Sequence, residues 1–173
     1  MFSLLFRRAR KAAKAGRARR PSRTLPTLEA LEDRCVPSTL AVTSGDDNVA
    51  EVGTLRFAVA HAQSGDTILL TKAVKNGITL TQGDLVLSQN VTIAALGDQP
   101  ITISGGGNSR IFEVNAGAQV TLENLNLTNG NGVANNPNDT SGLDANGGAI
   151  LSFGALTIND SNLCNNFAAG CVG

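Results

Sequence analysis

A chain of 173 residues has room for one domain of about 100 to 200 residues plus a tail, and without Trp or Tyr its core must use Ile, Leu, Val and Ala. The formal net charge of zero hides a division: ten of the 14 Lys and Arg residues lie at or before Arg34, whereas the later residues carry four basic and eleven acidic side chains. An acidic body repels a phosphate backbone and no apolar run approaches the roughly 18 residues of a membrane span, so the sequence argues against nucleic-acid binding and excludes a transmembrane helix.

Residues 1–38 are strongly basic and poor in large apolar groups, so we expect them to lie outside the fold, without fixed structure. Positive charge follows the short apolar start here, whereas it precedes the apolar stretch of a conventional secretory signal. However, Leu31-Glu32-Asp33-Arg34 followed by Val36-Pro37-Ser38 resembles the LEPR-type leader of large exported bacterial surface proteins, with Asp33 in place of proline. That resemblance implies export. The alternative is a cationic amphipathic helix for an anionic surface.

Residues 39–70 are predicted to form an N-terminal strand and a capping helix. Thr39 to Thr43 alternates like a short strand, and the turn-rich segment 44–48 follows it. Thr54 is a suitable N-cap for a helix that continues to Gln63, whose apolar stripe comprises Leu55, Ala58, Val59 and Ala62. Gly65-Asp66 ends the helix, and residues 67–70 form the next predicted strand.

This helix-to-strand segment resembles the CSLREA-type motif, which opens a parallel β-helix in its family. The matching residues are Thr54, Leu55, Arg56, Ala58, Val59, Ala62, Asp66, Thr67 and Ile68. Phe57 stands where the family has Glu, and Gly53 where it has Cys. The resemblance implies a cap in which the helix hides an apolar layer and an unpaired strand edge from other chains.

From residue 78 onward, short apolar alternations are separated by Gly, Asn and Asp, which accept the positive φ of sharp turns. The predicted strands are 78–80, 85–87, 91–93, 101–103, 120–122, 125–127 and 156–158. Segment 121–129 resembles segment 157–165 at an offset of 36 residues, and Val91-Thr92-Ile93 precedes Val120-Thr121-Leu122 by 29. Segment 131–146, rich in Asn, Asp and Gly, accounts for the difference as a loop. A period of this kind predicts coils of a solenoid rather than an antiparallel sandwich.

Near the C-terminus, Gly147-Gly148-Ala149-Ile150 resembles the polymorphic outer-membrane protein repeat. Half of that repeat's signature is present, because Phe167 follows the nearby asparagines instead of preceding one. Together these features predict an all-β, right-handed parallel β-helix of the pectin-lyase-like type, with about four coils in residues 71–173 and a short N-terminal capping helix. We expect its last coil to be open, either because the chain is a truncated copy of a longer protein or because it stacks on a partner.

The sequence offers no set of catalytic groups, although pectin-degrading enzymes use this architecture. Beyond the cap motif, the cations are Lys72, Lys75 and Arg110, and the acids are scattered singly, mostly as turn formers: Asp84, Asp98, Glu113, Glu123, Asp139, Asp144 and Asp160. His61, the single histidine, is expected on the solvent face of the helix rather than in an acid–base role, which leaves no Ser-His-Asp set. We therefore predict no catalytic, cofactor or metal residues.

Three other features have a structural and a functional interpretation. The loop Asn136 to Asp144 is rich in oxygen ligands for Ca²⁺ but lacks EF-hand spacing, so a hydrophilic loop is favoured. The glycines of Ser104 to Asn108 lack the Lys-Ser/Thr of a phosphate cradle, which favours a coil turn. Cys35, Cys164 and Cys171 lack zinc-site spacing. We therefore interpret the three cysteines as structurally incidental; the two alternatives for Cys164 and Cys171 are a disulfide in an oxidising compartment and small core residues on neighbouring strands.

The expected function is that of a non-catalytic, exported module at the cell surface, associated with the outer membrane, or outside the cell. It would be an adhesin-like rod with a structural or binding role toward a surface or carbohydrate partner, and it would stack on further coils or another chain. The alternative is the N-terminal part of a polysaccharide lyase-like or hydrolase-like β-helix enzyme, with its groove on downstream coils.

Overall fold

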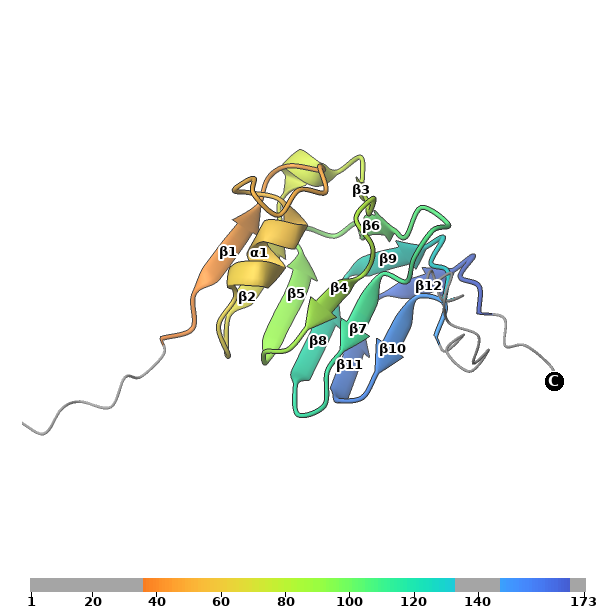
Figure 1. Ribbon diagram of the computed structural model, residues 1–173. Coiled ribbons are helices and arrows are strands. Elements are labelled where there is room, and N and C mark those ends of the chain that lie inside the picture. The colour runs from red at the N-terminus through yellow and green to blue at the C-terminus, as the bar shows by residue number, and fades with distance from the viewer. Residues whose placement is uncertain (1–35, 133–146, 169–173) are drawn as a thin grey trace, which may run out of the picture. The chain divides into compact units, whose positions relative to one another are not determined.

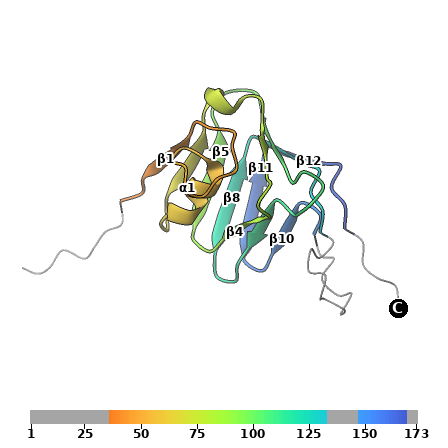
Figure 2. The same cartoon turned by 45° about the horizontal axis from the view of Figure 1, so that its top comes forward.

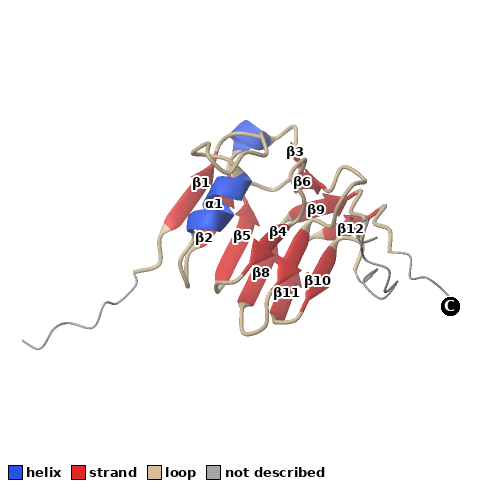
Figure 3. Ribbon diagram, viewed as in Figure 1, coloured by secondary structure: helices blue, strands red, loops and turns tan. Residues whose placement is uncertain are grey.

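The computed structural model of the protein describes residues 36–132 and 147–168, all within one compact unit. These residues form short strands with one α-helix, α1 (Leu55–His61), and one 3-10 turn, η1 (Lys72–Val74) (Figures 1 and 3). The strands are β1 (Thr39–Val42), β2 (Thr67–Leu70), β3 (Ile78–Thr79), β4 (Leu85–Leu87), β5 (Val91–Ala95), β6 (Ile101–Ser104), β7 (Phe112–Val114), β8 (Gln119–Glu123), β9 (Leu125–Thr128), β10 (Ile150–Ser152), β11 (Ala155–Asn159) and β12 (Asn162–Cys164). The predicted all-β class is confirmed.

The strands form three sheets, and every pairing between described strands is parallel. Sheet A has the order β1-β2-β5-β8-β11, sheet B the order β3-β6-β9-β12 and sheet C the order β4-β7-β10. The chain visits sheets A, B and C in turn and then returns to sheet A. Each such circuit therefore adds one strand to each sheet, and the strands of sheet A lie side by side from β1 to β11 (Figure 2).

The register stacks aliphatic side chains of successive circuits on one another. In sheet A one column runs through Ile68, Ile93, Leu122 and Ile158. In sheet B, Ile78 pairs with Ile103, which lies beside Leu127 and then Leu163. Each fully buried side chain of this size contributes roughly 1.5 to 3 kcal/mol. The offsets of 29 and 36 residues noted in the sequence recur here, because Val91 pairs with Val120 and Thr121 pairs with Thr157.

Sheet C contains a strand that the sequence pattern did not reveal. Strand β7 places Phe112 and Val114 in the core and Glu113 at the surface. Phe112 is completely buried between its register partners Leu85 and Ile150. The alternation of β7 is only three residues long, so its period is too short to distinguish it from a loop.

Asparagine and aspartate take left-handed backbone conformations at the two ends of strands in sheet B. Asn124 (φ 54°) and Asn129 (φ 51°) flank β9, and Asp160 (φ 47°) and Asn165 (φ 56°) flank β12 at the same positions of the next circuit. Their short polar side chains reduce the cost of this conformation. The chain therefore turns sharply at equivalent places, which keeps the strands of successive circuits in register.

A column of glycines allows close contact between circuits at the corner that joins sheets B and C. A Cβ atom on Gly105 would lie 2.9 Å from Gly130, and one on Gly130 would lie 2.9 Å from Ala149. A Cβ on Gly148 would lie 2.7 Å from the backbone nitrogen of Phe167. Real Cβ atoms do not approach backbone so closely, so glycine is required there. Gly105 also belongs to the segment 104–108, which forms the predicted turn between β6 and β7.

Helix α1 closes the N-terminal side of this arrangement. As predicted, Thr54 is its N-cap, and the hydroxyl accepts a hydrogen bond of 3.1 Å from the amide of Phe57. Leu55 and Ala58 are buried, and the helix packs against β1, β2 and β4. In chain order α1 precedes a strand of sheet A, as β4 and β7 do, and it lies beside β4 (Figure 1). The helix thus takes the place that a strand of sheet C occupies in later circuits.

Candidate functional site

The strongest cluster of charged groups lies beneath α1 and joins three segments of the chain. Arg56 of α1 forms an ion pair with Asp47, with 3.0 Å between Nη2 and Oδ2. The side chain of Asp47 is 1% exposed and that of Arg56 is 13% exposed. The same carboxylate accepts hydrogen bonds from the amides of Thr81 (2.6 Å) and Gln82 (2.8 Å). Asp47 therefore binds the connection between β3 and β4 to the loop that precedes α1.

The remaining donors of Arg56 are directed at backbone oxygen atoms. Its guanidinium donates to the carbonyl oxygens of Gly83 and Asp84, just before β4. Burial alone would raise the pKa of Asp47, but the hydrogen bonds from Arg56, Thr81 and Gln82 outweigh it and hold that pKa below its usual value. Both charged groups thus have hydrogen-bond partners. The ion pair therefore stabilises the fold, and neither side chain is left free to take part in a reaction.

A second carboxylate, Asp66, holds the segment before β1. Asp66 Oδ1 accepts hydrogen bonds from the amide (2.7 Å) and the hydroxyl (2.9 Å) of Ser38, and Oδ2 accepts one from the amide of Gln63 (2.8 Å). The amides of Gln63 and Ser38, followed by the Ser38 hydroxyl, lower the pKa of Asp66. The side chain therefore links the end of α1 to the start of β1 and keeps β1 paired with β2.

The polar residues of the predicted cap motif thus form hydrogen bonds mainly with backbone groups. The hydroxyl of Thr54 donates to the carbonyl oxygens of Asn48 (2.6 Å) and Glu51 (3.0 Å) in addition to capping α1. Arg56 and Asp66 bind segments on either side of the helix. Among the described residues, every buried side-chain nitrogen or oxygen has a hydrogen-bond partner. Together these contacts make the motif a determinant of folding at this end.

His61 lies at the exposed end of α1, as predicted. Its ring stacks on that of Phe57 with 3.9 Å between the ring centroids. Its Nδ1 lies 2.8 Å from the carbonyl oxygen of Phe57. These contacts are local to one turn of the helix, and they hold the imidazole against its own element.

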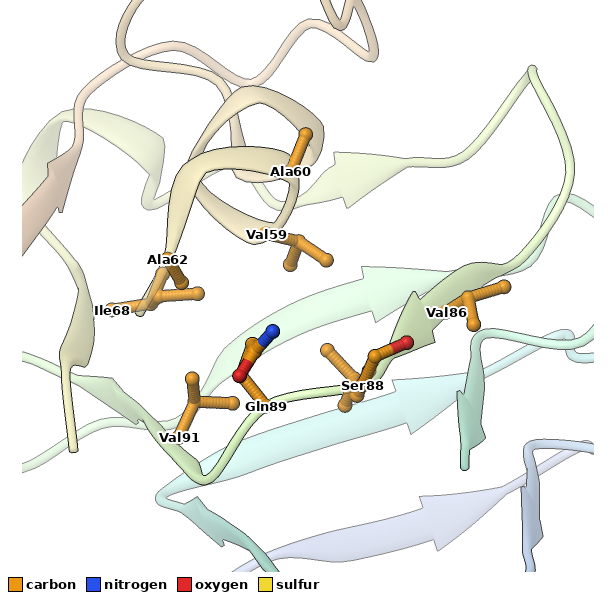
Figure 4. A pocket seen from close by; sticks show the side chains of 9 residues that line it. Val59, Ala60, Ala62, Ile68, Val86, Ser88, Gln89 and Val91 are labelled. Carbon is orange, nitrogen blue, oxygen red and sulfur yellow. The ribbon is translucent and has the colours of Figure 1, made fainter. Parts of the chain in front are cut away.

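A hollow of about 240 Å³, lined mainly by aliphatic residues, lies between α1 and the β4–β5 connection (Figure 4). Val59 and Ala62 stand on its helix side, and Ser88 and Gln89 on the opposite side. Its full lining is Val59, Ala60, Ala62, Ile68, Val86, Leu87, Ser88, Gln89 and Val91. None of these residues has a titratable side chain, so the lining offers no group for acid–base chemistry.

Two further hollows lie where sheets A and B meet, and charged side chains line both of them. The first, of about 380 Å³, lies beside η1 and contains Lys72, Lys75, Asp98 and Gln99 together with Leu96 and Pro100. Within the described ranges, Lys72 and Lys75 make no ion pair. The second, of about 780 Å³, contains Asp98, Glu123 and Asp160. The first hollow contains two lysines and the second contains two further acids, and Asp98 lines both hollows.

Two of the other acids named from the sequence share one arginine. Asp84 and Glu113 both lie near Arg110, with 3.4 Å between Asp84 Oδ2 and Arg110 Nε and 3.3 Å between Glu113 Oε2 and Arg110 Nη2. Glu113 and Glu123 lie within strands β7 and β8, so these two acids are not among the turn formers. In ranges 36–132 and 147–168, no three His, Cys, Asp or Glu side chains come together as metal ligands.

Several predicted features fall outside the described residues. They are the leader up to residue 35, most of the loop 131–146 with the segment Asn136 to Asp144, and the cysteines Cys35 and Cys171. Cys164 is described, and its side chain is exposed on β12. Of the two interpretations of Cys164, a place in the core is therefore wrong.

The sequence did not reveal that Asp47 and Ser38 belong to the cap. Asp47 stands in a turn-rich segment, where aspartate usually bonds its own backbone. A signal was nevertheless present, because Arg56 is a cation in a helix with a buried apolar stripe and needs a carboxylate nearby.

Comparison of the chain with protein families, with curated proteins and with solved structures finds no match. In the described part of the chain, no helix has the length and apolar character that crossing a membrane requires.

Proposed function

We propose that this protein is an exported surface or extracellular module built as a right-handed parallel β-helix of the pectin-lyase-like type. In this proposal α1 and its CSLREA-type motif cap the first coil, and residues 1–38 are an export leader of the LEPR type. The module has a structural or binding role toward a surface or carbohydrate partner, and it is not an enzyme.

The observation that carries the proposal is the cyclic order of sheets A, B and C with in-register aliphatic columns. A chain that adds one parallel strand to each sheet per circuit builds a stiff column whose side chains stack along one axis. Outward positions of the same strands carry Thr and Asn, such as Thr92, Thr121 and Thr157 in one row of sheet A. Rows of hydroxyl and amide groups suit repeated contacts with a polar polymer or surface.

The electrostatics favour a scaffold over catalysis. The two best buried carboxylates, Asp47 and Asp66, hold backbone amides of the cap. A lyase or hydrolase acting on a polysaccharide needs carboxylates grouped around one bond, with a cation or Ca²⁺ beside them. Asp84 and Glu113 flank Arg110 on the surface of sheet C, where each is part of an ion pair.

Fractionation of cells that produce the full chain tests export. Antibodies against residues 40–173 should detect the protein in the surface or extracellular fraction, and protease added to intact cells should degrade the cell-bound form. Recovery in the cytosol alone would contradict export. In a separate assay, cleavage of an acidic polysaccharide by the purified chain would favour the alternative enzyme. A solved structure with left-handed coils or antiparallel pairing would overturn the proposed fold.

A further inference from the structure

Two inward-facing side chains, Ile158 of β11 and Leu163 of β12, are exposed, although their register partners in the preceding circuit are fully buried. Ile158 is 38% exposed, whereas its partner Leu122 is 0% exposed. Leu163 is 47% exposed, and its partner Leu127 is buried. The core of the described sheets therefore ends in an uncovered apolar layer, which we call the open end.

Strand edges surround this layer on three sides. Strands β10, β11 and β12 are each edge strands, paired only with β7, β8 and β9 among the described strands. The amide of Ala155 donates to the carbonyl oxygen of Ala118, on the covered side of β11. Because successive amides of a strand point to opposite edges, the amides of Leu156 and Ile158 point away from β8. An occupant of the open end must offer both aliphatic side chains and partners for strand edges.

The opposite end of the described sheets does not present a matching surface. There α1 lies beside β4, the outermost strand of sheet C, and the segment before it approaches β3, where a Cβ on Gly45 would lie 3.0 Å from the carbonyl oxygen of Gly77. Strands β1, β3 and β4 are the terminal strands of the three sheets at that end, and α1 packs against β1 and β4. A head-to-tail stack of copies would therefore bring the open end against a helix and a polar loop.

We propose that the open ends of two copies of this chain pack together across a two-fold axis, with the two β11 strands paired antiparallel. A second open end offers partners for both features of the first, because it also has exposed aliphatic side chains and three unpaired strand edges. Asp160 is the one charged residue among residues 147–168, so two such surfaces meet with little repulsion. Because the contact is isologous, it closes as a dimer and does not extend into a fibre. This inference does not depend on export.

Light scattering during size-exclusion chromatography of the full chain, over a range of concentrations, tests the contact. The wild type should have the mass of two chains and dissociate on dilution. Leu163→Asp should raise the dissociation constant by about a hundredfold or more, because it places a charge in the apolar layer. Val86→Asp is the matched control, since Val86 is also 47% exposed but lies on β4, far from the open end along sheet C. That variant should leave the dissociation constant within about twofold of wild type.

Hydrogen exchange of the wild-type chain provides a test that needs no variant. The amides of Leu156 and Ile158 should be protected at concentrations where two chains associate and should lose protection on dilution, while that of Ile93 stays protected. A chain that is monomeric at millimolar concentration would overturn the proposal. So would a dimer that Leu163→Asp does not weaken, or protection of Leu156 and Ile158 that persists in the monomer, which would mean that the chain covers its own end.

Discussion

The two ends of the described sheets differ in how their last apolar layer and their strand edges are covered. At the N-terminal end, α1 and the loop before it cover the first layer, and Asp47, Arg56 and Asp66 satisfy the polar backbone around it. At the C-terminal end, Ile158 and Leu163 of the equivalent layer are exposed, and strand edges are unpaired in the described part of the chain. The N-terminal end is covered by a helix and a loop, whereas the C-terminal end exposes apolar side chains of the kind that are buried inside the column.

This difference shows which groups are hardest to cover where a stack of parallel strands ends. Apolar side chains inside the column need only another layer with the same register, which the repeated sequence supplies. A cover must also bind the amides and carbonyl groups that no longer have a strand beside them. The N-terminal end meets this need with one helix and two buried carboxylates, so charged groups there act in folding.

The largest effect should come from removing an aliphatic side chain at two depths of one column. Leu122→Ala should lower the free energy of unfolding by about 3 to 5 kcal/mol, because it leaves a cavity in a closed layer. Ile158→Ala, at the paired position of the open end, should cost less than about 1 kcal/mol in the dissociated chain. Chemical denaturation at low protein concentration measures both. Equal losses would show that the open end is covered after all.

The next effect should come from the buried carboxylate of the N-terminal cover. Asp47→Asn removes the charge that binds Arg56 and two amides, so the free energy of unfolding should fall by about 3 kcal/mol. Asp160→Asn is the control at the open end, because Asn accepts the same left-handed conformation there. That control should change the stability by less than about 0.5 kcal/mol. If both variants were equally stable, the ion pair with Arg56 would not hold the cover in place.

A smaller loss is expected at the helix N-cap. Thr54→Ala removes the hydroxyl that accepts from Phe57 and donates to Asn48 and Glu51, and it should cost about 1 to 2 kcal/mol. Thr157→Ala on exposed β11 should cost about 0.5 kcal/mol or less. Thermal unfolding followed by circular dichroism compares the two. Restoration of stability in Thr54→Ser would assign the loss to the hydroxyl, whereas no recovery would assign it to packing.

Local sequence patterns predicted most strands, helix α1 and the pairing offsets because these features repeat or alternate along the chain. The contacts that close the N-terminal end were not predicted, since they join residues far apart in sequence: Ser38 binds Asp66, and Asp47 binds the amide of Thr81. Nothing in the spacing of these residues indicates that they meet. The exposure of Cys164, by contrast, follows from alternation along β12, because Cys164 is in register with the outward Thr128 and its neighbour Leu163 with the buried Leu127.

The mildest test distinguishes the N-terminal cover from the interior of the column by pH. Both Asp47 and Asp66 have pKa values below the ordinary 3.8, so the folded state binds protons less readily than the unfolded state. Their contribution to stability is therefore complete above about pH 5 and is lost as the pH falls through the lowered values.

We expect the protection of the Gln63 and Thr81 amides from hydrogen exchange, corrected for the intrinsic rate, to fall between pH 5 and pH 2, since both donate to these carboxylates. The amide of Leu122, inside the column, should lose less protection over the same range, because no carboxylate holds it. Asp66→Asn should lower the protection of Gln63 at neutral pH and remove most of its acid dependence. If Gln63 and Leu122 lost protection together, the cover and the column would unfold as one cooperative unit, and the carboxylates would stabilise the whole stack rather than its N-terminal end.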